Sequence, residues 1–370
     1  MSRLNISRIQ NENEDGSAAV SGISTFSSTA FLQAPRGTTA QRPENPQPGM
    51  IRFNTDSGHL EYYTGEFWDE VLVANNSLDG GARGLFAVGF TSPAATNTID
   101  YITISTLGNA IDFGDSADTK YKISTNSSST RGIIAGGTLT PTFTNTNTIE
   151  YVTISSTGNA TDFSGDLTTA RGGFPGCSSA TRGIFPGGGS NVIDYVTIAS
   201  LGNAQDFGDL SSSRSDFGAV ASSTRGVFGG GYVSPARINI IEYVTISTIG
   251  NAIDFGDLTS TRESGPSGCS NSTRGLFAGG ITPTRVNTID YITIATLGNA
   301  VSFGSLSVAI NNSAGCSSAT RGVWGGGYTP TNVNTIEYVT ILTTGDALDF
   351  GDLTVTRRSA GALSNGHGGL

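Results

Sequence analysis

The strongest constraint on the fold is a six-residue segment, I-[DE]-Y-[VI]-T-I, that occurs six times at nearly regular spacing. Successive copies lie 44 to 50 residues apart, and a fixed period in this range is typical of repeat architectures. Each copy contains several β-type runs and none with a helical period. The sequence therefore predicts an all-β fold, a six-bladed β-propeller with four strands in each blade. The tyrosines that mark the copies are Tyr101, Tyr151, Tyr195, Tyr243, Tyr291 and Tyr338.

Four strands follow one another in a constant order in each copy. A strand of small residues leads into T-R-G, a glycine-rich strand comes next, the I-[DE]-Y segment is the third, and D-F-G-D-L belongs to the fourth. This order resembles the kelch repeat, although the kelch tryptophan is replaced by phenylalanine and the spacing before it is longer. The resemblance implies the fold, kelch-like, and no binding site. The arginines that match the returning arginine of kelch repeats are Arg171, Arg214, Arg262 and Arg357.

The ends of the repeat region, residues 75–370, indicate how such a fold would close. The last copy continues past Arg357 into Ser-Ala-Gly-Ala-Leu-Ser-Asn, which corresponds to the first strand of a further copy. We expect this C-terminal strand to complete the first blade and so to remove an open sheet edge. The alternative is that residues 75–81 supply the strand.

The first 74 residues differ in composition from the repeats. Residues 1–36 are polar and predict an extended N-terminal arm, and residues 37–74 predict a small β-meander that packs on a partner. The segment G-T-T-A-x-R-P-x-x-P-x-x-G-M-I-R-F-N-T-D, followed by L-E-Y-Y-T-G-x-F-W, resembles a segment of bacteriophage virion proteins, especially tail fibres of marine, cyanophage-type viruses. This resemblance implies a structural part of a virus particle, assembled in the host cytoplasm, with residues 1–74 joining other virion proteins.

Composition excludes several function classes. The net charge is −10 without a basic run, which argues against nucleic-acid binding, and no apolar run is long enough for membrane insertion. The two histidines, His59 and His367, lie outside the copies, so no His-dependent catalysis, metal site or cofactor is expected. The cysteines stand five residues before a T-R-G arginine in three different copies, which predicts buried free thiols; they are Cys177, Cys269 and Cys316.

One carboxylate recurs beside the tyrosine of each copy: Asp100, Glu150, Asp194, Glu242, Asp290 and Glu337. A set repeated in this way is expected to be structural, for example through pairing with the T-R-G arginines; an ion held by the carboxylates is the alternative. Acid–base catalysis would instead need carboxylates in unlike environments, or one asymmetric cluster of ionisable groups in the channel. The sequence predicts neither. The arginines at this position, which we call the T-R-G arginines although the first copy has A-R-G, are Arg83, Arg131, Arg182, Arg225, Arg274 and Arg321.

Binding residues are expected where the copies diverge, in the loop after the glycine-rich strand. The large side chains there are Phe143, Tyr232, Arg237, Arg285 and Tyr328. Aromatic and arginine side chains on variable loops of a rigid scaffold are typical of recognition surfaces, here for a host glycan or protein.

The sequence thus predicts a non-enzymatic virion component, a tail fibre or related appendage that displays a propeller for host-surface attachment. One alternative is an internal connector or decoration protein that contacts only virion proteins. A carbohydrate-active propeller enzyme is the other. A homo-oligomer would have to form through residues 1–74 or through the loop faces.

Overall fold

The computed structural model describes residues 34–71, 82–264 and 267–370 of the chain. The chain divides into two compact units, Met1–Asn75 and Asn76–Leu370. Apart from one 3-10 turn, η1 (Thr39–Gln41), the regular elements are all β-strands, so the predicted all-β class is confirmed. No helix in the described ranges has the length and apolar character needed to span a membrane.

The described part of the first unit is a small sheet of strands β1 (Arg36–Gly37), β2 (Ile51–Asn54), β3 (His59–Tyr63) and β4 (Trp68–Val71), in this order. Strands β2 to β4 form the expected antiparallel meander, and β1 adds to β2 in parallel. The buried Glu61 lies 2.6 Å from Arg42 and 3.4 Å from Arg52. The hydrogen bond from Arg42 is the main cause that lowers the pKa of Glu61. The predicted arm lies outside the described residues as far as residue 33.

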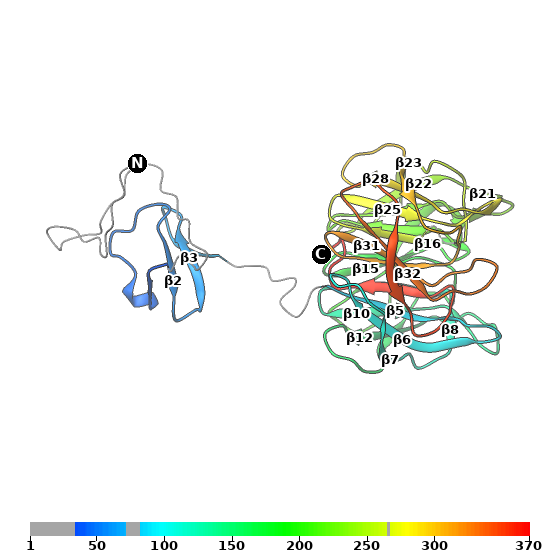
Figure 1. Cartoon of the computed structure of the whole chain (residues 1–370), viewed down its shortest axis with the longest axis horizontal. Helices are drawn as coiled ribbons and strands as arrows, with labels where there is room; N and C mark the ends of the chain where they lie inside the picture. The colour runs from blue at the N-terminus through cyan, green and yellow to red at the C-terminus, as the bar shows by residue number, and fades with distance from the viewer. Residues whose placement is uncertain (1–33, 72–81, 265–266) are drawn as a thin grey trace. The chain divides into compact units, whose positions relative to one another are not determined.

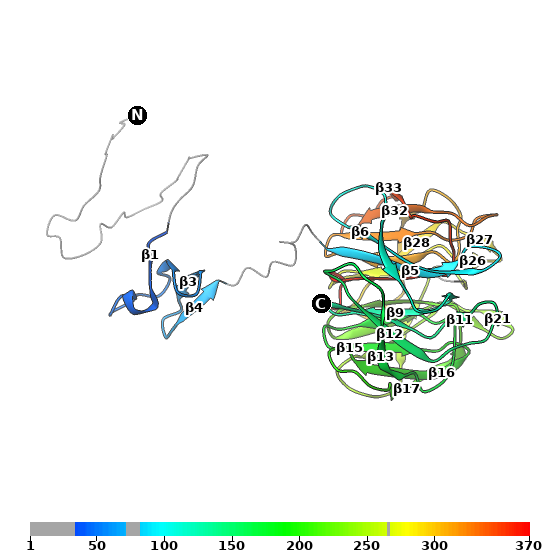
Figure 2. The same cartoon turned by 90° about the horizontal axis from the view of Figure 1, so that it is seen from below.

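The second unit contains six four-stranded antiparallel sheets of the same strand order (Figures 1 and 2). Within a sheet, the four strands come from one sequence copy except in sheet 1. Sheet 1 consists of β34 (Gly361–Ser364), β5 (Arg83–Phe90), β6 (Ala95–Thr103) and β7 (Ile111–Asp115), and sheet 2 of β9 (Ser124–Ser127), β10 (Arg131–Ala135), β12 (Thr148–Thr153) and β13 (Thr161–Asp166). Sheet 3 consists of β14 (Cys177–Ser178), β15 (Arg182–Pro186), β16 (Ser190–Thr197) and β17 (Gln205–Arg214), and sheet 4 of β18 (Gly218–Ala221), β19 (Arg225–Gly229), β22 (Ile240–Thr245) and β23 (Ile253–Asp257). Sheet 5 consists of β24 (Ser267–Ser270), β25 (Arg274–Ala278), β28 (Thr288–Thr293) and β29 (Val301–Ser305), and sheet 6 of β30 (Ala314–Ser317), β31 (Arg321–Gly325), β32 (Thr335–Thr340) and β33 (Leu348–Asp352).

The sheets are held together by six apolar clusters, one between each pair of neighbours. Both faces of a sheet are apolar because the third strand places side chains such as Ile149 on one face and Val152 on the other, as expected for a sheet covered on both sides. One cluster joins sheets 1 and 6 through residues that include Phe86 and Phe350. Since burial of each such side chain contributes roughly 1.5–3 kcal/mol, these clusters provide most of the stabilisation.

Hydrogen bonds from the T-R-G arginines link the same neighbours in cyclic order. Each arginine donates from Nη1 to the main-chain carbonyl of an isoleucine in the next sheet, at 2.7–3.2 Å, and Arg321 of sheet 6 donates to Ile104 of sheet 1. The same guanidinium groups lie 4.5–4.7 Å from the ring centre of the tyrosine in their own sheet.

The first strand of sheet 1 comes from the C-terminus. Strand β34 pairs with β5 in antiparallel register, from Gly361 opposite Ala87 to Ser364 opposite Gly84, which confirms the prediction. The alternative segment, residues 75–81, lies outside the described residues.

The cysteines explain one feature of the T-R-G motif. A Cβ atom on Gly84 would lie 2.8 Å from the sulfur of Cys316, and one on Gly226 would lie 2.7 Å from that of Cys177. Each thiol therefore occupies the space that the glycine leaves open in a neighbouring sheet. The predicted burial of the three cysteines is confirmed, and none forms a disulfide.

The second unit has two different ends. The C-terminus lies at one end, and short two-stranded sheets, two of them hairpins, lie at the opposite end, as Figures 1 and 2 both show. We call the latter the hairpin face. Its short strands are β8 (Lys120–Tyr121) with β11 (Thr138–Leu139), β20 (Tyr232–Val233) with β21 (Ala236–Arg237), and β26 (Ile281–Thr282) with β27 (Thr284–Arg285).

Candidate functional site

Two variable segments meet on the hairpin face. One is the loop between the second and third strands, where binding residues were predicted. The other lies in the connection from one sheet to the next. It is the pair of residues that directly follows the returning arginine, or Lys120 or Ile310 at the same position. Isolated bridges join the two, for example Asn311 with Tyr328 and Arg358 with Phe90. The second segment was not predicted as a binding region, although its first position also differs in every copy: Tyr121, Gly172, Ser215, Glu263, Asn311 and Arg358.

Tyr328 lies between two guanidinium groups. Arg285 and Arg358 are each 4.6 Å from the centre of its ring, within cation–π distance. Arg285 Nε donates a 2.8 Å hydrogen bond to Oδ1 of Asn311, which holds the side chain in place. The predicted residues Arg285 and Tyr328 are therefore brought together, and Arg358 is an addition that sequence reasoning missed.

Two further aromatic side chains extend this group. Arg358 lies 5.0 Å from the ring centre of Phe90, and the rings of Phe90 and Tyr121 are 5.2 Å apart. We call these five residues, Phe90, Tyr121, Arg285, Tyr328 and Arg358, the arginine–aromatic cluster. A groove lined by Tyr328, Arg358, neighbouring threonines and Asn332 runs beside it.

The electrostatics of the cluster favour a ligand with negative charge or hydroxyl groups. Among the described residues, neither Arg285 nor Arg358 forms an ion pair with a carboxylate. Their planar donors can bind carboxylate oxygens or sugar hydroxyls, while the aromatic faces can pack on a sugar ring or on an apolar side chain.

The other predicted binding residues lie elsewhere on the hairpin face. Tyr232 and Arg237 are opposite each other in the β20–β21 hairpin, and Arg237 is engaged in a 2.8 Å ion pair with Glu263. Phe143 is 59 % exposed in its own loop, and among the described residues no ring contact or hydrogen bond joins its side chain to either group. The five predicted residues therefore do not form one site.

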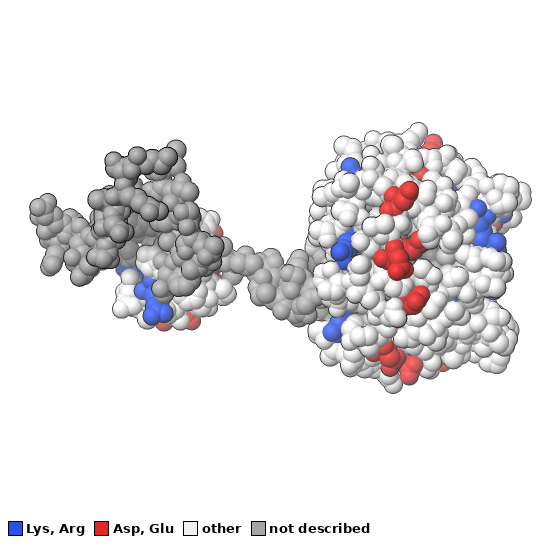
Figure 3. Space-filling model, viewed as in Figure 1, with Lys and Arg blue, Asp and Glu red and all other residues white. Residues whose placement is uncertain are grey.

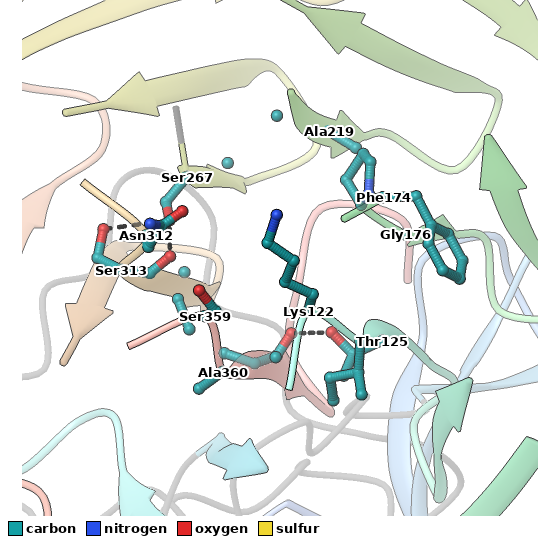
Figure 4. A pocket seen from close by; sticks show the side chains of 18 of the residues that line it. Lys122, Thr125, Phe174, Gly176, Ala219, Ser267, Asn312, Ser313, Ser359 and Ala360 are labelled. Atoms are coloured by element: carbon teal, nitrogen blue, oxygen red, sulfur yellow. Dashed lines mark hydrogen bonds between the residues drawn. The ribbon is translucent and has the colours of Figure 1, made fainter. Parts of the chain in front are cut away.

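An axial pocket of about 130 Å³ opens on the hairpin face where the six sheets meet (Figure 4). In five of the six copies its lining includes the second residue after the buried basic position, and this residue has positive φ in all six copies. Main-chain hydrogen bonds run between these residues: Gly173 donates to Lys122, Asp216 to Gly173, Asn312 to Ser264, Ser359 to Asn312, and Lys122 to Ser359.

This pocket corrects one expectation. The channel was predicted to hold no asymmetric ionisable groups, but Lys122 and Asp216 both line the pocket and approach within 3.3 Å of each other. The remaining copies carry glycine, serine or asparagine at this position, so the charges break the repeat symmetry. The prediction failed because the position lies in the connection between copies and not in the motif itself.

An adjoining pocket of about 60 Å³ is lined mainly by small side chains. Serine hydroxyls donate to the main-chain carbonyl of the adjacent sheet, for example Ser317 to Ser270 at 2.7 Å and Ser127 to Ser364 at 2.7 Å. His367 contacts the same layer, 3.0 Å from the carbonyl oxygen of Ser127. Burial lowers the pKa of His367, which favours the neutral imidazole. The tail histidine thus packs inside the unit.

The cysteines do not supply a nucleophile. Burial raises the pKa of Cys177 and Cys316 to about 12, and burial together with the nearby Cys316 raises that of Cys269 well above its ordinary value. Their thiols are therefore protonated at neutral pH, whereas attack or metal binding needs the thiolate. The described residues contain no group of three side chains that could hold a metal ion.

All six repeated carboxylates are buried, and five of them form ion pairs, but not with the predicted arginines. The partners are the returning arginines, in Arg171–Asp194, Arg214–Glu242 and Arg357–Asp100 at 2.8–2.9 Å and in Arg262–Asp290. Lys120 takes the same place against Glu150 at 2.6 Å. The T-R-G arginines are on the other face of the strand, beside the tyrosine. Glu337 differs from the other five, because no described residue forms an ion pair with it.

Comparison of the chain with protein-family models and with curated proteins gave no match. The geometry of the hairpin face is therefore the main guide to function.

Proposed function

We propose that the second unit is a six-bladed, kelch-like β-propeller that acts as a binding module of a virion appendage, and that the chain is not an enzyme. The fold is supported by six sheets of equal strand order, by an apolar cluster between each pair of neighbours, and by arginine hydrogen bonds that return from sheet 6 to sheet 1. A closed propeller has this cyclic order of contacts and leaves no long open edge.

The arginine–aromatic cluster carries the binding part of the proposal. Tyr328 is held between two guanidinium groups that have no carboxylate partner among the described residues. Side chains of this kind, fixed on a rigid scaffold at positions where the copies diverge, are the usual basis of recognition. The ligand class that fits is a host-surface glycan with hydroxyl and carboxylate groups, or an acidic protein segment.

The appendage part of the proposal rests on residues 37–72, whose sequence resembles virion proteins. Residues 1–74 would join the chain to other virion proteins, or to further copies of itself. One face of the small sheet supports this role, because Ile51 and Tyr62 are opposite each other across β2 and β3 and are 54 % and 37 % exposed. Exposed apolar side chains on so small a sheet are typical of a contact surface.

The two alternatives differ in what the hairpin face contacts. A connector or decoration protein would use it only for virion proteins. A carbohydrate-active enzyme would need a reactive group, and the Lys122–Asp216 pair in the axial pocket is the one observation that favours this class.

A glycan array and host-cell binding, both with the full-length protein, test the proposal. We expect retention on acidic glycans and on host cells, and we expect Tyr328→Ala and Arg358→Ala each to weaken it. Leu201→Ala is the control, because Leu201 is 50 % exposed in the turn between β16 and β17, away from the cluster. No binding to glycans or to cells would favour the connector. Release of sugars from the host envelope, lost in Asp216→Asn, would instead show an enzyme.

A further inference from the structure

Sheet 6 lacks the basic side chain that the other five sheets bury. Alignment of the copies places Ile310 where the others have Lys120, Arg171, Arg214, Arg262 and Arg357. The carboxylate that such a side chain would neutralise is nevertheless present, since Glu337 stands at the position of Asp290 and Glu242.

Glu337 is buried and only partly satisfied. Its residue is 7 % exposed, and Oε1 accepts a 3.0 Å hydrogen bond from the main-chain N–H of Ser307. No described residue donates to Oε2. In the equivalent sheet, Glu242 also accepts from a main-chain N–H, that of Ser211, and its Oε2 is bound by Arg214 at 2.9 Å. Oε2 is not among the side-chain atoms shielded from solvent, so a cation that enters from the surface can bind this free carboxylate oxygen through charge-assisted hydrogen bonds.

A cavity of about 190 Å³ lies beside this carboxylate, and we call it the Glu337 cavity. Ile310 lines it and takes the place of the first carbons of the missing arginine. A cavity needs a volume of only about 10–15 Å³ to hold one water molecule, so the Glu337 cavity has room for a small organic cation. Val308, which also lines it, is 48 % exposed, so the cavity reaches the surface.

The acceptors that line the cavity match those that bind a guanidinium group elsewhere in the chain. In sheet 5, Arg262 donates to Asp290 and to the carbonyls of Gly279 and Thr288. In sheet 4, Arg214 donates to Glu242 and to the carbonyls of Gly230 and Ile240. The equivalent residues of sheet 6 are Glu337, Gly326 and Thr335, and all three line the cavity.

We infer that the Glu337 cavity is a binding site for an alkylguanidinium cation, either a free small molecule or the arginine side chain of a partner protein. The cation would lie with its planar head against Glu337 and the two carbonyls, and with its alkyl part directed past Val308 to the surface. The site is independent of the arginine–aromatic cluster and goes beyond the proposed attachment role.

The test is calorimetric titration of the full-length protein with methylguanidinium chloride, with methylammonium chloride and sodium chloride as controls for charge. We expect saturable binding of methylguanidinium only. Glu337→Gln should weaken it at least about tenfold, because hydrogen bonds to an ionised acceptor are roughly twice as strong as neutral ones. Ile310→Arg should abolish it and raise the melting temperature, since the new side chain would occupy the site. Ile310→Val is the matched control, because its side chain leaves the cavity open, and it should retain binding.

An arginine-containing peptide separates the two sources of the cation. Binding of methylguanidinium and of the peptide assigns the site to a protein side chain, and binding of methylguanidinium alone assigns it to a free small molecule. The inference is wrong if methylguanidinium gives no saturable heat, if methylammonium binds equally well, or if Ile310→Arg binds as the parent does. Because glycan binding is measured with a different ligand and with the variants Tyr328→Ala and Arg358→Ala, failure here leaves the glycan-binding proposal intact.

Discussion

Arg321 Nη1 donates a 2.9 Å hydrogen bond to the main-chain carbonyl of Ile104, although the two residues are 217 positions apart in the sequence. The same bond joins Arg274 of sheet 5 to Ile341 of sheet 6, and it recurs between all four remaining pairs of neighbouring sheets. The contact between the last and the first sheet is thus of the same kind as the internal ones. This equivalence is the main reason to propose a closed propeller.

Truncation after Arg357 removes β34 and is expected to destabilise the second unit. It exposes the edge of β5 and removes Leu363, which is 5 % exposed. We expect the melting temperature to fall by roughly 5–10 °C, given about 1.5–3 kcal/mol for one buried apolar side chain and the further loss of strand pairing. Differential scanning calorimetry measures the change.

Truncation after Ser364 is the control for this experiment. It keeps β34 and removes only the tail that carries His367, so the shift should be clearly smaller. Equal melting temperatures for the parent and for the protein truncated after Arg357 would show that β34 does not stabilise the unit.

The buried pair Lys120–Glu150 predicts a dependence of stability on acid pH. Burial of Glu150 opposes its charged form, but the ammonium of Lys120 and hydrogen bonds from Lys120, Ser116 and Ala117 outweigh it, so the pKa of Glu150 is lowered from 4.5. A carboxyl with a lowered pKa in the folded state stabilises the fold above about pH 4.5, and this contribution is lost as the pH falls through the folded pKa.

Urea titrations between neutral pH and pH 3 measure this effect in the double variant Lys120→Met/Glu150→Gln. We expect the free energy of unfolding to fall less steeply with acid in the variant than in the parent. Both proteins keep His367, so the difference between the two slopes isolates Glu150. Identical slopes would mean that the pair does not contribute as described.

The three cysteines should be unreactive in the folded protein. Burial raises the pKa of Cys177 and Cys316 to about 12, so almost no thiolate is present at pH 8. With a chromogenic disulfide reagent we expect no rapid reaction under native conditions and three equivalents in denaturant. Rapid modification of any thiol in the native protein would contradict the packing of the cysteines against T-R-G glycines.

Much of the strand order follows from the sequence, because the period of the copies and the alternation of side chains are both visible there. The pairing of residues 361–364 with the first copy could be predicted, since they repeat the first strand of a copy. The predicted partner of the carboxylates was wrong because the T-R-G arginines lie on the opposite face of the sheet. Arg131 lies opposite Thr153 and shares a strand face with Tyr151, whereas Glu150 points to the other face.

The site was only partly predictable. Divergence between copies pointed to Arg285 and Tyr328, but it was sought only in the loop after the glycine-rich strand. Arg358 and Phe90 were missed because they come from opposite ends of the repeat region and meet only when β34 pairs with β5. The carboxylate of Glu337 was grouped with five equivalents, since the replacement of its basic partner by Ile310 is evident only after the pairing is known.

The closed arrangement of the six sheets can be tested most directly by a short cross-link between sheets 6 and 1. The N–H of Asp352 donates to Oδ1 of Asn109 at 3.0 Å, as that of Asp115 does to Asn159 between sheets 1 and 2. In variants with cysteine at both positions of a pair, a short bis-maleimide should join 109 to 352 as efficiently as 115 to 159, and it should not join 109 to 209. Efficient linkage of 115 to 159 together with none of 109 to 352 would contradict the closed propeller.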